Sequence, residues 1–252
     1  MKKLFILFIV ATFSVVGYSQ NYQNYHFDVN GDGVVTAADV TSLYDYLLGN
    51  IFVPEYVDLG LPSGTLWAKT NVGATKPEET GDYFAWGETT PKDTYFFDTY
   101  KWCMGSINTL TKYCTNSSNG YNGFTDGKTE LVPEDDAATA NWGSEWCMPT
   151  KAQQDELLAE CTWQWTTING VKGYLLTSKH NGASLFLPAV GYLRFELYYS
   201  GMYGYYWSRT LGSSNQNTAY SLKFGLTGEI GVNDAQLRCL GLSVRAVRVS
   251  QK

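Results

Sequence analysis

The chain has 252 residues, of which 44% are hydrophobic and 15% aromatic, with 18 Lys plus Arg against 24 Asp plus Glu. This composition excludes disordered, collagen-like and coiled-coil chains and predicts an ordered globular protein. The net charge of −6 argues against nucleic-acid binding, because affinity for phosphate depends mainly on Lys and Arg. His26 and His180 alone offer little material for a multi-histidine zinc site or a Ser/His/Asp hydrolase.

Residues 1–19 have the pattern of a secretory signal peptide. Two lysines precede an apolar run from Leu4 to Val16, and Gly17 and Ser19 supply small residues at positions −3 and −1 of a cleavage site. The alternative is a buried N-terminal helix. No later stretch is apolar over the roughly 18 residues that a membrane span needs. We therefore expect a secreted protein, extracellular or at the cell surface, with no membrane span.

Five cysteines gain a possible structural role from export, because disulfides persist outside the cytosol. Their odd number leaves at least one unpaired within the chain. Cys103 and Cys114 lie close enough in sequence for a local bridge, and Cys147 and Cys161 flank a predicted helix, but the sequence does not settle the connectivity of these four and Cys239. A catalytic thiol is the weaker alternative, because no histidine or basic cluster adjoins any of the five.

The segment DVNGDGVVTAAD places oxygen ligands at the spacing of a calcium loop. A glycine stands at the sixth position, where the chain must turn sharply, and the seventh residue offers its carbonyl. The alternative is an Asp/Asn/Gly turn without a metal. The predicted cofactor is therefore calcium, and its predicted ligands are Asp28, Asn30, Asp32, the Val34 carbonyl and Asp39.

A helix is expected directly after this loop. Thr36 can cap it, Val40, Leu43 and Leu47 recur at spacings of three and four residues, and Gly49 ends it. With its final aspartate and the ending SLYDYLLGN, the segment 20–50 resembles a dockerin type I repeat. Dockerins carry two such repeats in tandem and bind a cohesin module, whereas one repeat is present here. The resemblance implies calcium binding and a cohesin-like partner.

Residues 51–56 form an expected linker, after which the composition changes to many Trp, Tyr and Gly. Helices are predicted over Asp136–Asn141 and over Lys151–Cys161, the second with a Thr150/Gln153 capping box. Short apolar runs between Gly, Asn and Ser predict strands within GTLWAKTNV, GYLLTS, SLFLPAV, AYSLKFG and SVRAVRV. Two helices and many short strands predict an α+β fold.

Several separate motifs in residues 57–252 occur in the order VDLGLPSGTLWAKTNVGA, GDYFAWGETTPK, EWCMPTKAQQDELL, FLPAVGYLR, GYYWSRT and GLSVRAVR. In these motifs the domain resembles the Fibrobacter succinogenes major paralogous domain, a family common in secreted proteins of gut Bacteroidetes. The resemblance implies a C-type-lectin-like domain. It implies no established activity, because the molecular activity of the family is not generally known.

Most conspicuous side chains of this domain have structural interpretations. Glu134, Asp135 and Asp136 are expected to cap the short helix, since negative groups favour a helix N-terminus. Arg245 is expected to pair with an internal carboxylate. The large aromatic residues in the motifs are expected to fill a core, namely Trp67, Trp86, Trp146, Tyr206 and Trp207.

Two activities of related folds lack their motifs here. The EPN-, QPD- and WND-like signatures of calcium-dependent sugar binding are absent, and Cys239 has no neighbouring cysteine for formylglycine-generating chemistry. A glycosidase needs two carboxylates across a cleft, for which Glu88 and Glu196 are only speculative candidates. The domain is therefore expected not to be an enzyme.

The stretch from Arg194 to Arg238 is rich in Tyr, Ser, Asn and Gly, a composition typical of binding loops. We expect a secreted recognition protein that binds a glycan or a surface protein there; ordinary tyrosines covering a β-rich fold are the alternative interpretation. Other possibilities are a polysaccharide-degradation component or enzyme, and an assembly subunit docking through the dockerin-like repeat. The candidate ligand-binding residues are Arg194, Tyr198, Tyr199, Tyr203, Asn215, Asn217, Tyr220, Asn233, Asp234 and Arg238.

Overall fold

The computed structural model describes residues 36, 37, 39–41, 43 and 52–249. The chain divides into two compact units, Met1–Val53 and Pro54–Lys252, and each is described by itself. The expected signal peptide and four of the five predicted calcium ligands, Asp28, Asn30, Asp32 and Val34, lie outside the described residues. Within the described residues, no helix is long and apolar enough to cross a membrane.

The described part of the first unit is helical at residues 37, 39–41 and 43, directly after Thr36, where the sequence predicts a helix to begin. Asp39 is buried, and its Oδ2 accepts hydrogen bonds from the backbone N–H of Thr36 at 2.5 Å and from its hydroxyl at 3.4 Å. An acidic side chain that reaches back to the residue before the helix is the reciprocal half of a capping box.

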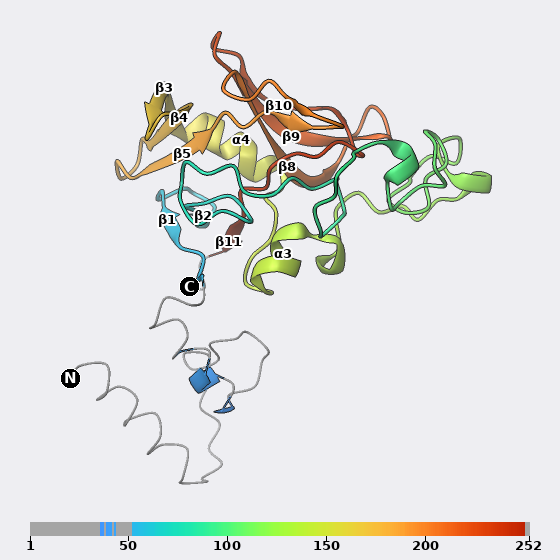
Figure 1. Cartoon of the computed structure of the whole chain (residues 1–252), viewed down its shortest axis with the longest axis horizontal. Coiled ribbons are helices and arrows are strands. Elements are labelled where there is room, and N and C mark those ends of the chain that lie inside the picture. The colour runs from blue at the N-terminus through green and yellow to red at the C-terminus, as the bar shows by residue number, and fades with distance from the viewer. Residues whose placement is uncertain (1–35, 38, 42, 44–51, 250–252) are drawn as a thin grey trace. The chain divides into compact units, whose positions relative to one another are not determined.

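The second unit contains small antiparallel sheets (Figure 1). The strand orders are β1-β2-β11, β10-β9-β8, β3-β4-β5 and β6-β7. The strands of the first two sheets are β1 (Tyr56–Asp58), β2 (Thr65–Ala68), β11 (Val247–Val249), β8 (Tyr203–Leu211), β9 (Thr218–Gly225) and β10 (Ile230–Leu237). Those of the other two are β3 (Cys161–Ile168), β4 (Val171–Ser178), β5 (Ser184–Pro188), β6 (Tyr192–Leu193) and β7 (Leu197–Tyr198).

Two α-helices lie in this unit, α3 (Ala137–Trp142) and α4 (Lys151–Glu160); α4 begins at the predicted residue and α3 one residue later than predicted. Asp136 caps α3 by accepting hydrogen bonds from the N–H groups of Ala138 and Thr139. Thr150 and Gln153 form the predicted capping box of α4, which contacts β3, β8, β9 and β10. Three short 3₁₀ helices complete the described elements: η1 (Phe97–Thr99), η2 (Tyr121–Gly123) and η3 (Pro133–Asp135).

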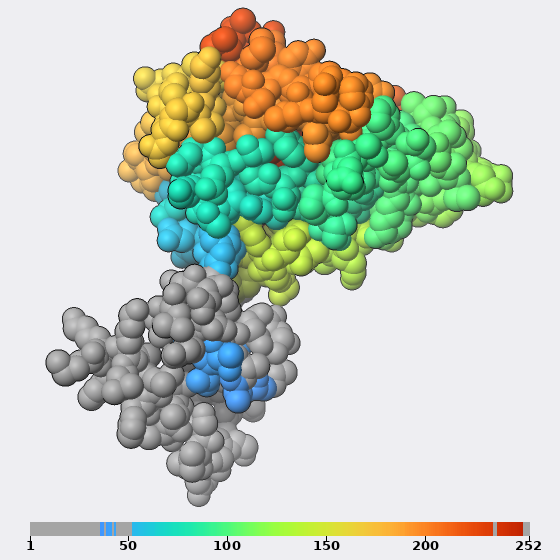
Figure 2. Space-filling view, viewed as in Figure 1, coloured from blue at the N-terminus to red at the C-terminus, as the bar shows by residue number. Residues whose placement is uncertain are grey.

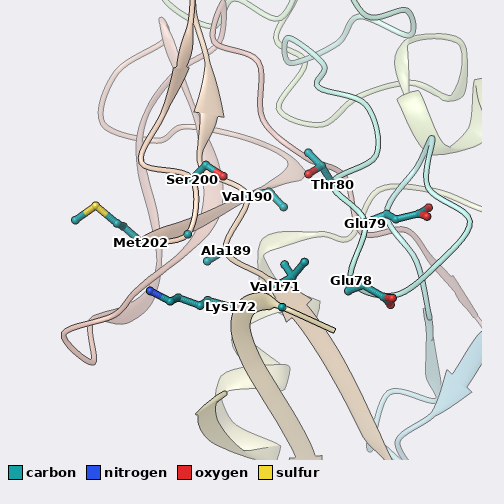
Figure 3. A pocket seen from close by; sticks show the side chains of 11 residues that line it. Glu78, Glu79, Thr80, Val171, Lys172, Ala189, Val190, Ser200 and Met202 are labelled. Carbon is teal, nitrogen blue, oxygen red and sulfur yellow. The ribbon is translucent and has the colours of Figure 1, made fainter. Parts of the chain in front are cut away.

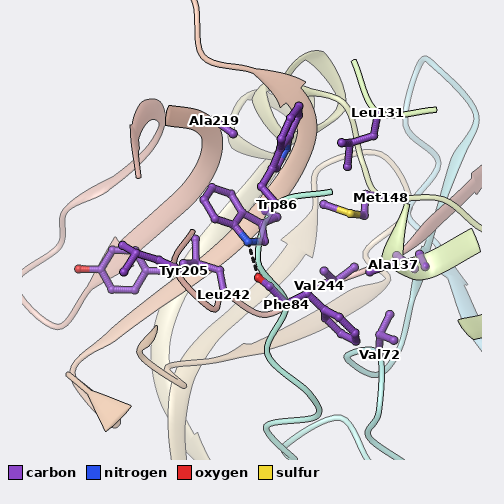
Figure 4. Packing of buried hydrophobic residues seen from close by; sticks show 14 of the residues in the cluster. Val72, Phe84, Trp86, Leu131, Ala137, Met148, Tyr205, Ala219, Leu242 and Val244 are labelled. Atoms are coloured by element: carbon purple, nitrogen blue, oxygen red, sulfur yellow. Dashed lines mark hydrogen bonds between the residues drawn. The ribbon is translucent and has the colours of Figure 1, made fainter. Parts of the chain in front are cut away.

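The core residues expected from the motifs are buried, as Figure 4 shows for the cluster around Trp86. Trp67 and Tyr206 belong to a second cluster beneath β4 and β5. The Trp207 indole N–H donates to the Phe84 carbonyl at 2.8 Å, so a large apolar ring is buried without leaving its polar atom unpaired. The interpretation of these aromatic residues as core is confirmed.

The coarse prediction of an α+β fold with few helices and many short strands is confirmed. Each of the five runs predicted to contain strands does contain one, in β2, β4, β5, β9 and β11. The stretch 194–238, whose composition is typical of binding loops, also holds the strands β8, β9 and β10, which form one sheet; the sequence pattern predicts only the middle one, within AYSLKFG. Tyr, Trp and Val in these strands favour a pleated, half-buried surface.

Arg245 differs from its expectation, since no carboxylate among the described residues pairs with it. Its guanidinium is fully buried and donates to the Asn71 side chain and to the carbonyls of Ala68, Lys69 and Phe186. Burial lowers the pKa of Arg245 to about 10, because desolvation disfavours the charged form.

All five cysteines lie within residues 52–249, and all are free thiols. Four are buried, and the fifth, Cys147, is partly buried. Desolvation raises the pKa of each thiol, in Cys161 to about 11 and in Cys239 to about 12. Raised pKa values oppose the reactive thiolate form at neutral pH.

Candidate recognition surface

The β6–β7 hairpin displays the first residues of the predicted binding stretch, 194–198. Tyr192 pairs with Tyr198, and Leu193 with Leu197, so that residues 194–196 form the turn. Gly191 precedes the hairpin with φ +69°, and a Cβ added there would lie 2.0 Å from the Tyr198 carbonyl oxygen. Only glycine therefore permits the close return of this chain without a shift of the backbone.

Aromatic rings from this hairpin continue into neighbouring segments. Tyr192 stacks on Tyr198 with ring centroids 5.3 Å apart, and Phe195 meets Tyr198 edge-on at 5.6 Å. Phe96, almost 100 residues earlier, stacks on Phe195 at 6.1 Å with the ring planes nearly parallel. We call this set the aromatic surface, and it comprises Phe96, Tyr192, Phe195, Tyr198, Tyr199 and Tyr203.

Tyr199 stands out by its backbone. Its φ is +58°, in the left-handed region that non-glycine residues seldom adopt, and its side chain is 49% exposed. Its carbonyl accepts hydrogen bonds from the N–H groups of Met202 and Tyr203, and its ring meets that of Tyr203 at 5.5 Å. A strained residue held in place by its neighbours suggests a functional role for its side chain.

Cations cover two ends of the aromatic surface. The Arg194 guanidinium lies 4.6 Å from the centroid of Phe96, and Lys223 Nζ lies 4.9 Å from that of Tyr203. Desolvation, together with a hydrogen bond to Glu196, raises the pKa of the Tyr198 phenol. The phenol therefore stays neutral at physiological pH and retains its hydroxyl as both donor and acceptor.

A cavity of about 620 Å³ adjoins the turn that follows Tyr199. Figure 3 shows Lys172 and Met202 together at one rim and Glu78 and Glu79 at the opposite rim. The turn is tied to the cavity floor, because the Gly201 N–H donates to the Ala189 carbonyl at 2.7 Å. The cavity is therefore lined by segments that are distant in the sequence. Figure 2 shows the orange atoms of the C-terminal strands packed against the teal segment near residues 70–90.

Four predicted ligand-binding residues, Arg194, Tyr198, Tyr199 and Tyr203, come together on or beside the aromatic surface. The others lie in or next to β9 and β10. Tyr220 shares a hydrogen bond of 2.8 Å with the Ser213 hydroxyl. Asn215 lies in the turn before β9 and Asn233 in β10; the backbone of Asp234 is also in β10, and its side chain lies outside the described residues.

Arg238 and Asn217 must be removed from the candidate site. Arg238 is fully buried, with its guanidinium 4.9 Å from the Trp86 ring centroid, and it donates to the Tyr100 hydroxyl and to the carbonyls of Lys112, Tyr113 and Gln216. Asn217 is buried and donates to the Asn108 side chain at 2.7 Å. Both hold loops together inside the fold and are inaccessible to an external ligand.

Sequence reasoning missed other members of the site. Tyr192 and Phe195 lie beside the predicted residues, and their proximity to Tyr198 in sequence could have suggested them. Phe96, Glu78 and Lys172 reach the same face only through the tertiary fold, so no local pattern could have identified them.

The two speculative catalytic carboxylates have different surroundings. Glu88 is buried, forms an ion pair with Lys92 at 2.8 Å and accepts the Lys101 N–H. Glu196 is exposed in the β6–β7 turn beside Tyr198. In the described part of the chain, no group of three or more His, Cys, Asp or Glu residues could hold a metal ion.

Comparisons with models of protein families, with curated proteins and with solved structures found no match.

Proposed function

We propose that this chain is a secreted, non-enzymatic recognition protein whose C-terminal lectin-like domain binds a glycan or surface-protein ligand through the aromatic surface. The observation that carries the proposal is the contiguity of six rings, among them that of the strained and exposed Tyr199. Tyrosine offers a large contact area at a low cost in side-chain entropy, and this is why it predominates in binding loops.

Exposure of apolar side chains supports the same proposal. Phe195 is 56% exposed, and Leu197 in β7 and Tyr199, Met202 and Leu226 in the following turns are exposed to a similar extent. The Leu226 N–H donates to the Met202 carbonyl, which joins the last of these turns to the others. Contiguous exposed apolar area on a soluble domain typically marks an interaction site.

The proposed lectin-like fold rests on the motif resemblance together with the small antiparallel sheets, two helices and long irregular segments of the second unit. For the first unit we propose a dockerin-like repeat that binds calcium through Asp28, Asn30, Asp32, the Val34 carbonyl and Asp39. The spacing of the oxygen ligands supports this assignment, and a cohesin-like partner follows from it as a proposal.

Glycan and surface-protein arrays probed with the full chain test the function. A ligand found there should lose about thirtyfold in affinity with Tyr199→Ala or Phe195→Ala, since a hot-spot residue contributes roughly 2 kcal/mol. Tyr121→Ala is the matched control, because Tyr121 is 43% exposed on η2 outside the aromatic surface. Equal binding by all three variants would move the site elsewhere.

Two other outcomes would replace the proposal. Loss of binding upon deletion of residues 20–50 would favour an assembly subunit that docks through its dockerin-like repeat. Polysaccharide hydrolysis that disappears in Glu88→Gln or Glu196→Gln would favour an enzyme. Neither is expected, since the aromatic surface belongs to the second unit and the surroundings of Glu88 are those of a structural ion pair.

A further inference from the structure

Building on the proposed function, we propose that the ligand of the aromatic surface is a neutral oligosaccharide chain. One sugar unit occupies the cavity beside Tyr199, and the following units lie across the exposed rings of Tyr199 and Phe195. The inference rests on the combination of a concave subsite with mixed polarity and exposed aromatic rings directly next to it.

The cavity has the size and lining of a small-ligand subsite. Its volume of about 620 Å³ lies within the roughly 300–1,000 Å³ typical of ligand pockets. Val171 and Ala189 form an apolar part between the charged rims in Figure 3, and Ser200 adds a hydroxyl. A sugar ring matches this arrangement, because its C–H faces are apolar while its hydroxyl groups at the ring edge both donate and accept.

Both kinds of hydrogen-bonding partner are present at the rims. Lys172 is an exposed donor that forms no ion pair among the described residues, whereas Glu78 accepts one hydrogen bond from Asn169 and retains further acceptor capacity. Ligands that carry only donors or only acceptors would use one rim and leave the other unpaired. A polyhydroxylated ligand uses both.

The exposed rings extend the subsite along the surface. Tyr199 directly precedes Ser200, which lines the cavity, and its carbonyl accepts the N–H of Met202, another lining residue, so the turn that carries its ring adjoins the cavity. From there, ring contacts lead through Tyr198 to Phe195. Apolar faces of successive sugar units can pack on these rings, which places a chain rather than a single sugar on the protein.

Charge favours a neutral chain over an acidic one. The net charge is −6, and Glu78, Glu79 and Glu196 all lie at the cavity or on the hairpin. The nearby cations Arg194 and Lys223 already cover aromatic rings, and Lys223 also pairs with Glu229. A polyanion would meet repulsion that Lys172 alone does not offset.

Calorimetry with the full chain tests the inference, using gluco-, xylo-, manno- and chito-oligosaccharides from the monosaccharide to the hexasaccharide as probes. At least one series should bind, with affinity that rises with length until the chain spans the cavity and the rings. Tyr199→Ala and Phe195→Ala should weaken it at least tenfold. Ser200→Trp should abolish binding by filling the cavity, while Ser117→Trp, at another exposed serine, should leave it unchanged.

The possible results distinguish a failure of this inference from a failure of the proposed recognition function. Unchanged affinity in Ser200→Trp, with an unchanged melting temperature, would overturn the assignment of the cavity. Tighter binding of a sulfated or uronic-acid chain, lost in Lys172→Ala but kept in the exposed control Lys128→Ala, would overturn the neutral class. A protein ligand that depends on Tyr199, with none of the oligosaccharides bound, would overturn the inference and leave the proposed function standing. Absence of any Tyr199-dependent ligand would overturn both.

Discussion

Because Tyr199 has a left-handed backbone, replacing it is expected to affect stability and ligand binding in different ways. Left-handed backbone costs an L-residue roughly 1–2 kcal/mol, and asparagine tolerates it better than tyrosine. We expect Tyr199→Asn to keep or raise the melting temperature in thermal denaturation while ligand binding is lost. Tyr121→Asn, which changes a tyrosine outside the aromatic surface, should not affect binding. A marked fall in melting temperature would mean that the ring of Tyr199 serves mainly to hold the fold together.

The opposite behaviour is expected at Arg238. Replacing it with Met removes four hydrogen bonds and leaves the carbonyl oxygens of Lys112, Tyr113 and Gln216 without this donor. Each buried polar group left unpaired costs about 1–3 kcal/mol. Urea denaturation should therefore show a loss of about 3 kcal/mol or more. A change within about 0.5 kcal/mol, as for an ordinary surface substitution, would contradict the structural role.

Composition alone could not separate these two residues. Arg194 and Arg238 bound the same aromatic and polar stretch, yet one lies exposed over Phe96 and the other is enclosed by Trp86, Tyr100 and Tyr113. The difference arises from residues 86–113, which are far away in sequence. The grouping of candidate residues on one surface was therefore predictable where they are local to the hairpin, and the burial of Arg238 was not, because tertiary contacts decide it.

The β6–β7 hairpin depends on the glycine that precedes it. Gly191→Ala should lower stability by more than the roughly 1 kcal/mol cost of a left-handed alanine, because its Cβ would meet the Tyr198 carbonyl oxygen, and it should also impair ligand binding. Gly182→Ala isolates the conformational cost, since Gly182 has a similar φ of +74° with open space around it. Equal losses of unfolding free energy in the two variants would show that the hairpin adapts to the added methyl group.

In the first unit, two substitutions can distinguish the proposed calcium binding from helix capping. Calcium should raise the melting temperature of the full chain by linkage, and Asp32→Ala should abolish both this rise and calorimetric calcium binding. Asp39→Ala should, in addition, weaken the helix without calcium, because Asp39 accepts the Thr36 N–H. No binding by the unaltered chain at millimolar calcium would reduce the segment to a turn.

Local signals account for the elements that could be predicted. Asp136 and Thr150 are short polar side chains at helix starts, and their capping contacts form within three residues. β3 was missed because its residues follow α4 without a break, since Cys161 both ends the helix and begins the strand. The pairing of the strands was not predictable either. For example, β2 lies between β1 and β11, and β11 comes from the other end of the unit's sequence.

At the scale of the whole molecule, buried tyrosine hydroxyls and cysteine thiols predict that the folded state loses stability at alkaline pH. Burial raises the pKa of Tyr205 and Tyr206 from 10.0 to about 12 and that of Cys239 from 9.0 to about 12. The unfolded chain loses these protons first, so the stability they contribute is complete below about pH 9 and is lost as pH rises from there toward 12. Denaturant midpoints should fall over this range. Tyr205→Phe should flatten the fall, and a constant midpoint would contradict the burial of these groups.

The last described residues join parts of the domain that are far apart in sequence. Gly241 bridges Leu193, Leu242 bridges Phe84, Ser243 bridges Tyr206, and Val247 pairs with Trp67 about 180 residues earlier. At 5–20 residues per second, a ribosome needs roughly 10–35 seconds to make the chain between those two partners. Until then β2 lacks one neighbour, and pairings between residues so far apart in sequence slow folding. For the exported protein that we propose, a nascent domain that stays open until these residues are made is in a state that an export channel can thread.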